Sequence, residues 1–142
     1  MTSMLVRPSW RALMTATFVE AAVLVLAQPA TAVEVSVCKD QGEETCVEDG
    51  DTFVWNKERI RIENIDAPEL GDPCARDMAA QSANRLAALL SSGSVEISRS
   101  EQAAGHRTRA TVTVDAQDVG LELVAEGLAH KWMGSSENWC AE

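Results

Sequence analysis

The sequence lacks the closely spaced cysteine and histidine pairs that bind zinc. Its four cysteines include no C-x-x-C pair, and its only two histidines, His106 and His130, are far from any cysteine along the chain. Structural zinc sites place these ligands at short, regular spacings. The pattern therefore disfavours a zinc-binding domain.

Long apolar runs are also missing. The stretch 12–27 is interrupted by Glu20, and the uninterrupted part, 21–27, is far shorter than the roughly 20 residues that cross a bilayer. It is followed by Pro29-Ala30-Thr31-Ala32, an A-x-A ending of the kind that signal peptidase cuts. We therefore expect residues 1–32 to be a cleaved signal peptide rather than an anchor, and the mature protein to be periplasmic or secreted.

Basic residues are scarce. The chain has 12 lysines and arginines against 22 aspartates and glutamates, a net charge of −10. Residues 1–32 hold Arg7, Arg11 and Glu20, so the mature chain carries −11. A protein of this sign repels a polyanion unless its cations gather on one face or a divalent ion intervenes. The composition disfavours tight nucleic-acid binding, but it does not exclude catalysis.

All four cysteines follow the expected cleavage point. An even number in a small exported domain indicates two disulfides, for which the sequence alone allows three pairings. We expect Cys38–Cys46 across a short polar loop. The second bond would then be Cys74–Cys140, which ties the C-terminus to the middle of the chain.

The periodicity of apolar residues predicts an α+β, mainly β fold. Helices are expected over 74–90 and from a cap at Asp118 to about Gly127. Strands are expected over 33–37, 52–55, 60–65, 95–98 and 110–114. This order suits a single domain, 33–142, built as a five-stranded Greek-key barrel of the oligonucleotide-binding (OB) type with two to three helices.

Carboxylates and arginines crowd into residues 47–70. Calcium prefers hard oxygen ligands, such as those of Asp51 and Asp66, and guanidinium groups such as that of Arg61 bind phosphate. Asp51 can face Asp66 only if a reversal at Asn56-Lys57-Glu58 pairs their strands. The segment is therefore either a metal site with a phosphate clamp or a polar hairpin between buried strands.

Four ordered blocks carry a resemblance to a known family. They are Asp49-Gly50-Asp51-Thr52, then Arg61 to Glu69 with Ile65-Asp66-Ala67-Pro68, then Arg107 ahead of Val112-Thr113-Val114-Asp115, and Asp118-Val119-Gly120 with Leu123 to Ala129. With these blocks the chain resembles the staphylococcal nuclease-like family of thermonuclease homologues. Its cysteine placement resembles the exported bacterial branch of that family.

The resemblance implies a calcium-dependent phosphodiesterase, a nuclease that acts on DNA and/or RNA. By family pattern Asp51, Asp66 and the backbone carbonyl of Ala67 bind Ca²⁺, and Glu69 acts as the general base. Arg61 and Arg107 bind the scissile phosphate. The expected partner is a nucleic acid, with single strands preferred, and the expected state is a monomer with no membrane attachment after cleavage.

The sequence departs from the family where Tyr-Gly-Arg is usual. It has Gly105-His106-Arg107-Thr108-Arg109 there, and it has no tyrosine at all. Counting back from Asp115 without a gap selects Arg107 over Arg109 as the phosphate ligand. The aromatic residues that remain near the C-terminus, Trp132 and Trp139, are interpreted as a cover for the end of the barrel rather than as stacking platforms.

Other interpretations of these residues remain open. Asp49 belongs to an Asp-Gly turn dipeptide, and Arg61 has Glu58 and Glu63 as alternative ion-pair partners. At the level of function, the alternatives are a non-catalytic OB-fold module that binds oligonucleotide or protein, and an acidic domain in which calcium is structural.

Overall fold

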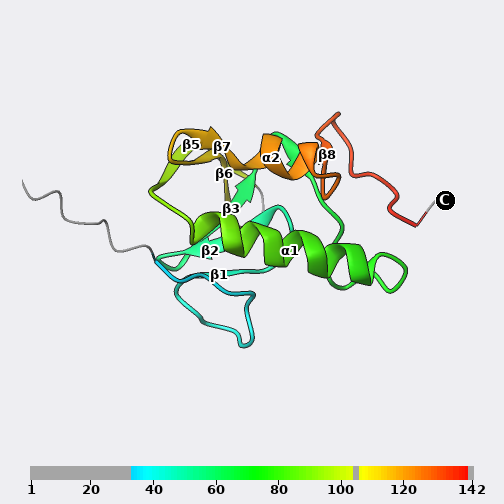
Figure 1. Ribbon diagram of the computed structural model, residues 1–142, viewed down its shortest axis with the longest axis horizontal. Coiled ribbons are helices and arrows are strands. Elements are labelled where there is room, and N and C mark those ends of the chain that lie inside the picture. Colours follow the sequence, from blue (N-terminus) through cyan, green and yellow to red (C-terminus); the bar gives the residue numbers. More distant parts are fainter. Residues whose placement is uncertain (1–32, 104–105, 141–142) are drawn as a thin grey trace, which may run out of the picture.

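The structure, a computed structural model, describes residues 33–103 and 106–140 (Figure 1). The expected signal peptide lies outside the described residues. Within them the fold is α+β and mainly β. The described residues form two helices, α1 (Arg76–Leu90) and α2 (Val119–Ala125). The strands are β1 (Cys46–Val47), β2 (Thr52–Trp55), β3 (Glu58–Ile62), β4 (Ile65–Asp66), β5 (Val95–Ala103), β6 (Arg107–Val114), β7 (Gln117–Asp118) and β8 (His130–Lys131).

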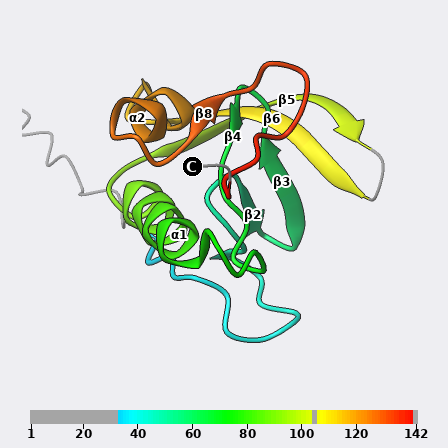
Figure 2. The same ribbon diagram turned by 90° about the vertical axis from the view of Figure 1, so that its right-hand side faces the viewer.

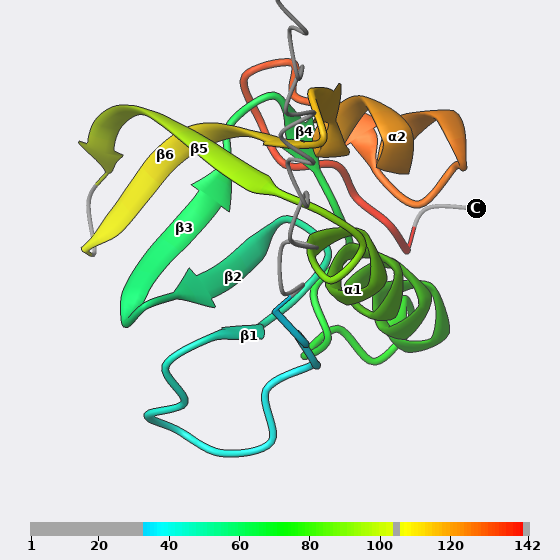
Figure 3. The ribbon, with the colours of Figure 1, turned by 60° about the vertical axis from the view of Figure 1, so that its left-hand side comes forward.

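The strands form two sheets. The larger has six strands, in the order β1-β2-β3-β6-β5 with β7 beside β6, and only its β3–β6 pair is parallel. The smaller pairs β4 with β8. Figure 3 shows both helices on one side of the larger sheet, and Figure 2 shows the same arrangement. The described strand pairings do not close into the single five-stranded barrel that the sequence suggested.

The hairpin between β2 and β3 is confirmed. Trp55 pairs with Glu58, which leaves Asn56 and Lys57 as a two-residue loop with φ values of 50° and 69°. Positive φ at both loop positions is typical of the tight turns whose twist matches that of an antiparallel pair. The pairing sets Thr52 opposite Arg61 and so brings the two halves of the acidic segment together.

Two predicted strands differ from the observed ones. Residues 33–37 make only an isolated bridge, Val37 to Val47, and the N–H of Val35 bonds Ser91 Oγ at 2.9 Å, so this segment runs along the core without joining a ladder. The predicted strand 60–65 breaks into β3 and β4 at a turn. Because of this turn, β4 leaves the larger sheet and pairs with β8 instead.

The helices bury the faces that their sequences suggest. In α1 the side chains of Ala79, Ala83, Leu86 and Leu90 enter the core, whereas Met78, expected on the same face, is 40% exposed. The start of α2 is capped as predicted, because Asp118 Oδ1 accepts a hydrogen bond from Leu121 N at 2.9 Å.

Two disulfides join the pairs expected from the sequence. The Cα atoms of Cys38 and Cys46 are 4.9 Å apart, and those of Cys74 and Cys140 are 5.6 Å apart. Disulfides persist in oxidising environments, so the described domain is suited to an oxidising environment. Among the described residues, neither helix has the length and hydrophobicity that crossing a membrane would require.

Candidate functional site

The site is centred on two buried carboxylates bridged by one arginine. Asp51 and Asp66 are only 2% and 3% exposed. Arg61, on β3, places Nη1 at 2.8 Å from Asp51 Oδ1 and Nη2 at 3.3 Å from Asp66 Oδ1. A single guanidinium therefore holds two acidic groups, one immediately before β2 and the other on β4.

Local hydrogen bonds fix the Asp51 carboxylate immediately before β2. Its Oδ1 also accepts from Thr52 Oγ1 at 2.8 Å, and its Oδ2 accepts from the backbone N–H of Ala67 at 3.1 Å. Its backbone carbonyl accepts from Ile62 N at 2.8 Å. Asp51 is therefore hydrogen-bonded both to Ile62, the last residue of β3, and to Ala67, the residue after β4.

The C-terminal tail, residues 134–140, binds the oxygen of Asp66 that Arg61 does not contact. Asp66 Oδ2 accepts from the backbone N–H of Glu137 at 2.9 Å and from Trp139 Nε1 at 3.2 Å. Trp132 lies against Arg61, whose Cζ is 5.5 Å from the centre of the ring. From the sequence, Trp132 and Trp139 are expected only to cover the end of the barrel. Their contacts with Arg61 and Asp66 have no local sequence signal, because both tryptophans are distant from these residues along the chain.

Asp49 and Glu69 are two further carboxyl groups near Asp51. Burial raises the pKa of Asp49 to about 7, and the neighbouring charges of Asp51 and Glu69 raise it too. Glu69 itself is exposed, just after the buried Ala67-Pro68 pair. The expected acidic residues are thus gathered in one region, with Glu69 at its surface.

Gly50 allows helix α1 to approach the acidic loop, the turn of Asp49 to Asp51, closely. A Cβ at position 50 would lie 1.9 Å from Ser82 Oγ and 2.7 Å from Ala67 Cβ. Ser82 is fully buried on α1, so the helix packs directly against the turn that carries Asp49 and Asp51. The glycine is therefore required by close packing, in addition to its place in a turn.

The second predicted arginine lies on the same face of the sheet as the first. In the parallel pair of β3 and β6, Arg61 is opposite Arg109, and side chains two residues apart on a strand share a face. Arg107 thus lies on the face of Arg61 and Arg109, opposite the buried Thr108 and Ala110. The side chain of Arg107 makes no hydrogen bond or ion pair with any residue that the structure describes between 33 and 140.

The alternative partners of Arg61 are engaged elsewhere. Glu58 bonds Arg99 Nε at 3.0 Å, and this hydrogen bond lowers the pKa of the Glu58 carboxyl. Glu63 accepts from the hydroxyl groups of Ser100 and Thr111. The structure thus pairs Arg61 with the two aspartates and not with the nearby glutamates.

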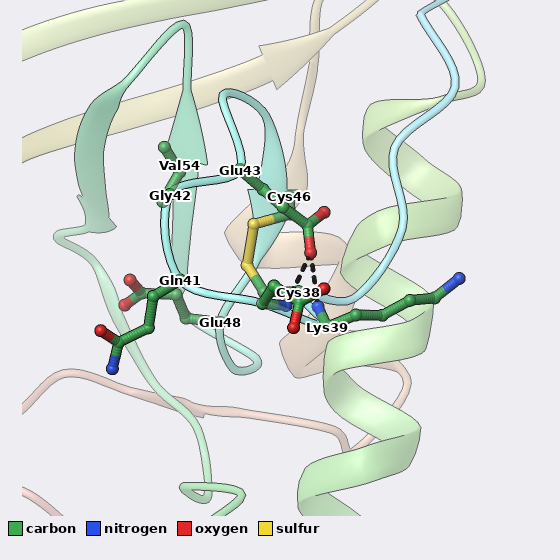
Figure 4. Close-up of a pocket in the computed structure, with 9 residues that line it drawn as sticks. Cys38, Lys39, Gln41, Gly42, Glu43, Cys46, Glu48 and Val54 are labelled. Carbon is green, nitrogen blue, oxygen red and sulfur yellow. Dashed lines mark hydrogen bonds between the residues drawn. A yellow bond between two sulfur atoms is a disulfide. The ribbon is translucent and has the colours of Figure 1, made fainter.

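A hollow of about 450 Å³ lies away from these residues, in the loop closed by Cys38–Cys46 (Figure 4). Glu43 fixes this loop from inside, because its Oε1 accepts from the backbone N–H groups of Lys39 and Asp40 at 2.6 and 2.9 Å. These bonds lower the pKa of Glu43. The lining of the hollow includes none of the predicted catalytic or metal-binding residues.

The donor set of the acidic site suits Ca²⁺. Calcium is bound by carboxylate and carbonyl oxygens, and Asp51 and Asp66 present oxygens to one shared cation, the Arg61 guanidinium. The backbone of Ala67 is adjacent, because its N–H already bonds Asp51. The residues present are therefore chemically suited to a hard divalent ion.

Fold and site together define a small, mainly β domain whose sheet presents arginines beside a buried pair of aspartates. A family described as staphylococcal nuclease homologue matches residues 59–139, more than half of the chain. The chain therefore belongs to the family of staphylococcal nuclease homologues. The match includes Arg61, Asp66, Glu69 and Arg107 and begins after Asp51. No curated protein matches the chain.

Proposed function

We propose that the protein is a calcium-dependent phosphodiesterase that hydrolyses DNA or RNA, with single strands preferred. The observation that carries the proposal is the bridge from Arg61 to Asp51 and Asp66, in a chain of the nuclease-homologue family. A guanidinium beside two buried carboxylates provides a phosphate ligand next to a set of metal ligands. A solvated polar hairpin would not need both carboxylates buried.

In this proposal Asp51, Asp66 and the carbonyl of Ala67 hold Ca²⁺. When bound, the ion would supply positive charge to a phosphate oxygen and lower the pKa of a coordinated water. The chain's own contribution is the fixed orientation of both carboxylates, through Thr52 and Ala67 at Asp51 and through the tail at Asp66. Such orientation reduces the reorganisation that a metal site would otherwise require.

Glu69 is the proposed general base. It is exposed at the edge of the acidic cluster, where a water molecule can reach it, and its charge acts on Asp49. A carboxylate in this position can take a proton from an attacking water. Arg61 and Arg107, on one face of the β3–β6 pair, would donate hydrogen bonds to the phosphate oxygens, where charge builds up during the reaction.

The export route and the finer fold belong to the same proposal. We propose that residues 1–32 are a signal peptide and that the mature domain, 33–142, acts as a monomer in the periplasm or outside the cell. The two disulfides support an oxidising destination. Family membership supports an arrangement of the OB type for the strands around the site.

The test is cleavage of denatured DNA and of RNA by the purified, oxidised protein, in Ca²⁺ and in EGTA. We expect cleavage in Ca²⁺ and none in EGTA. Glu69→Gln should lower the cleavage rate by about 10²–10⁴-fold, as the loss of a general base does. Glu96→Gln, at an exposed carboxylate on β5, is the matched control and should cleave normally. A folded wild-type protein that binds oligonucleotide but cuts none would contradict the proposal and favour the binding module.

A further inference from the structure

The C-terminal part of the chain holds Asp66 by both its backbone and its side chain. In the smaller sheet, His130 on β8 pairs with Asp66 on β4. The side chain of Asp66 receives two more hydrogen bonds, from Glu137 N and Trp139 Nε1, across separations of 71 and 73 residues. The acidic cluster consists of Asp49, Asp51, Asp66 and Glu69. Among these described residues, only Asp66 accepts hydrogen bonds from donors so far away in the sequence.

The two oxygens of Asp66 have different partners. Both tail donors bind Oδ2, whereas Oδ1 faces the guanidinium of Arg61 at 3.3 Å. Two donors on one oxygen fix the rotation of the carboxylate about its Cβ–Cγ bond. They leave Oδ1 as the oxygen that faces a cation, and the same oxygen would face a metal ion.

The tail depends on a few anchors for its position. Residues 134–138 form no helix or strand. Trp139 stacks on His130, with ring centres 4.2 Å apart and an angle of 19° between the planes. The next residue, Cys140, is linked to Cys74 just before α1. These anchors hold the indole N–H at the distance from Asp66 that a hydrogen bond requires.

We infer that Trp139 is a positioning residue for Asp66, and that the Cys74–Cys140 disulfide keeps it in place. The inference rests on the proposed function, because it assigns the tail a task in preparing a metal ligand. Groups that hydrogen-bond a metal ligand orient it, and their loss typically weakens metal affinity about 10–100-fold. The C-terminal tail is then part of the functional site and does more than close one end of the sheet.

Trp139→Phe tests the inference, because it removes the N–H donor and keeps an aromatic ring that can lie against His130. Calcium binding to the purified protein is measured by titration calorimetry, and folding by the melting temperature without calcium. We expect the calcium dissociation constant to rise about tenfold with little change in melting temperature. The calcium concentration for half-maximal cleavage should rise by the same factor.

Trp55→Phe is the matched control. Trp55 packs on Phe53, and its indole N–H bonds no group in the part of the chain that the structure describes. Its loss can lower the melting temperature, but the calcium dissociation constant should stay at the wild-type value. An unchanged dissociation constant in Trp139→Phe would overturn the inference.

The disulfide is tested with the double variant Cys74→Ser/Cys140→Ser beside Cys38→Ser/Cys46→Ser. The first pair should weaken calcium binding as Trp139→Phe does, and the second, in a loop away from Asp66, should not. Equal effects of the two pairs would show that the Cys74–Cys140 bond has no special role at the site. If the double variant fails to fold, Trp139→Phe alone still decides whether Trp139 positions Asp66.

The two proposals fail in different ways. If the wild-type protein neither binds calcium nor cleaves, both the proposed function and the inference are contradicted. Wild-type protein that cleaves in calcium, with Trp139→Phe equal to it at every calcium concentration, would remove the inference alone.

Discussion

Arg61 Nη1 lies 2.8 Å from Asp51 Oδ1, and this contact provides a buried aspartate with its positive partner. Arg61→Ala would leave both Asp51 and Asp66 buried without that cation. Removing one member of a buried ion pair costs about 3–5 kcal/mol. We expect a loss of this order in the free energy of urea unfolding without calcium, and a smaller loss in calcium, because the metal ion replaces the missing charge.

Arg59→Ala is the control for this experiment. Arg59 pairs with Glu48 at the surface, where ion pairs contribute about 1 kcal/mol or less. A similarly small effect for Arg61→Ala would contradict the central place given to its bridge.

Arg107 and Arg109 can be distinguished by their effects on cleavage. The side chain of Arg107 makes no hydrogen bond or ion pair among the described residues, so Arg107→Ala should change stability little. If its guanidinium stabilises the phosphate in the transition state, kcat should fall about 10²–10³-fold. Arg109 lies directly opposite Arg61, but the count back from Asp115 selects Arg107, so Arg109→Ala should lower kcat less. The reverse result, in steady-state assays of both alanine variants, would transfer the phosphate-binding role to Arg109.

Asp49 predicts a dependence of stability on pH in metal-free buffer. Its pKa is raised from 3.8 to about 7 in the folded protein, so between these pH values the folded protein keeps a proton that the unfolded chain has lost. Stability should therefore fall as pH rises from about 4 to about 7. Asp49→Asn removes this loss and should stabilise the protein progressively over that range.

Melting curves at pH 4.5, 6 and 8 measure this effect. Asp77→Asn, at an exposed aspartate in the first turn of α1, should show no such trend. If the gain from Asp49→Asn were the same at all three pH values, the raised pKa would not be its cause.

Gly50 should tolerate no side chain. Because a Cβ there would lie 1.9 Å from Ser82 Oγ, Gly50→Ala must displace α1 or the acidic loop. Overpacking of this kind costs about 1–3 kcal/mol, and the loop that carries Asp51 would move with it. Denaturant unfolding should show the loss, and adding Ser82→Ala should restore part of it. Gly71→Ala, where nothing lies within 4 Å, should be close to neutral.

The local elements could be predicted well because their determinants are neighbours in sequence. The reversal at Asn56-Lys57, the cap at Asp118 and the apolar face of α1 each depend on a few adjacent residues. The prediction was wrong for 33–37, where alternating residues suggested a strand. That segment is held by a single bridge to Val47 and by hydrogen bonds to Ser91, and a local alternation does not reveal that no full ladder forms.

Proximity along the chain is enough to predict which residues gather at the site, because Asp51, Arg61, Asp66 and Glu69 lie close together along one hairpin and the turn after it. How their charges are matched depends on tertiary packing. Arg61 bridges the two aspartates instead of pairing with a glutamate on its own strand, and Trp139 reaches Asp66 from 73 residues away. Contacts of this length depend on how sheets, helix and tail pack together, and no local spacing specifies that packing.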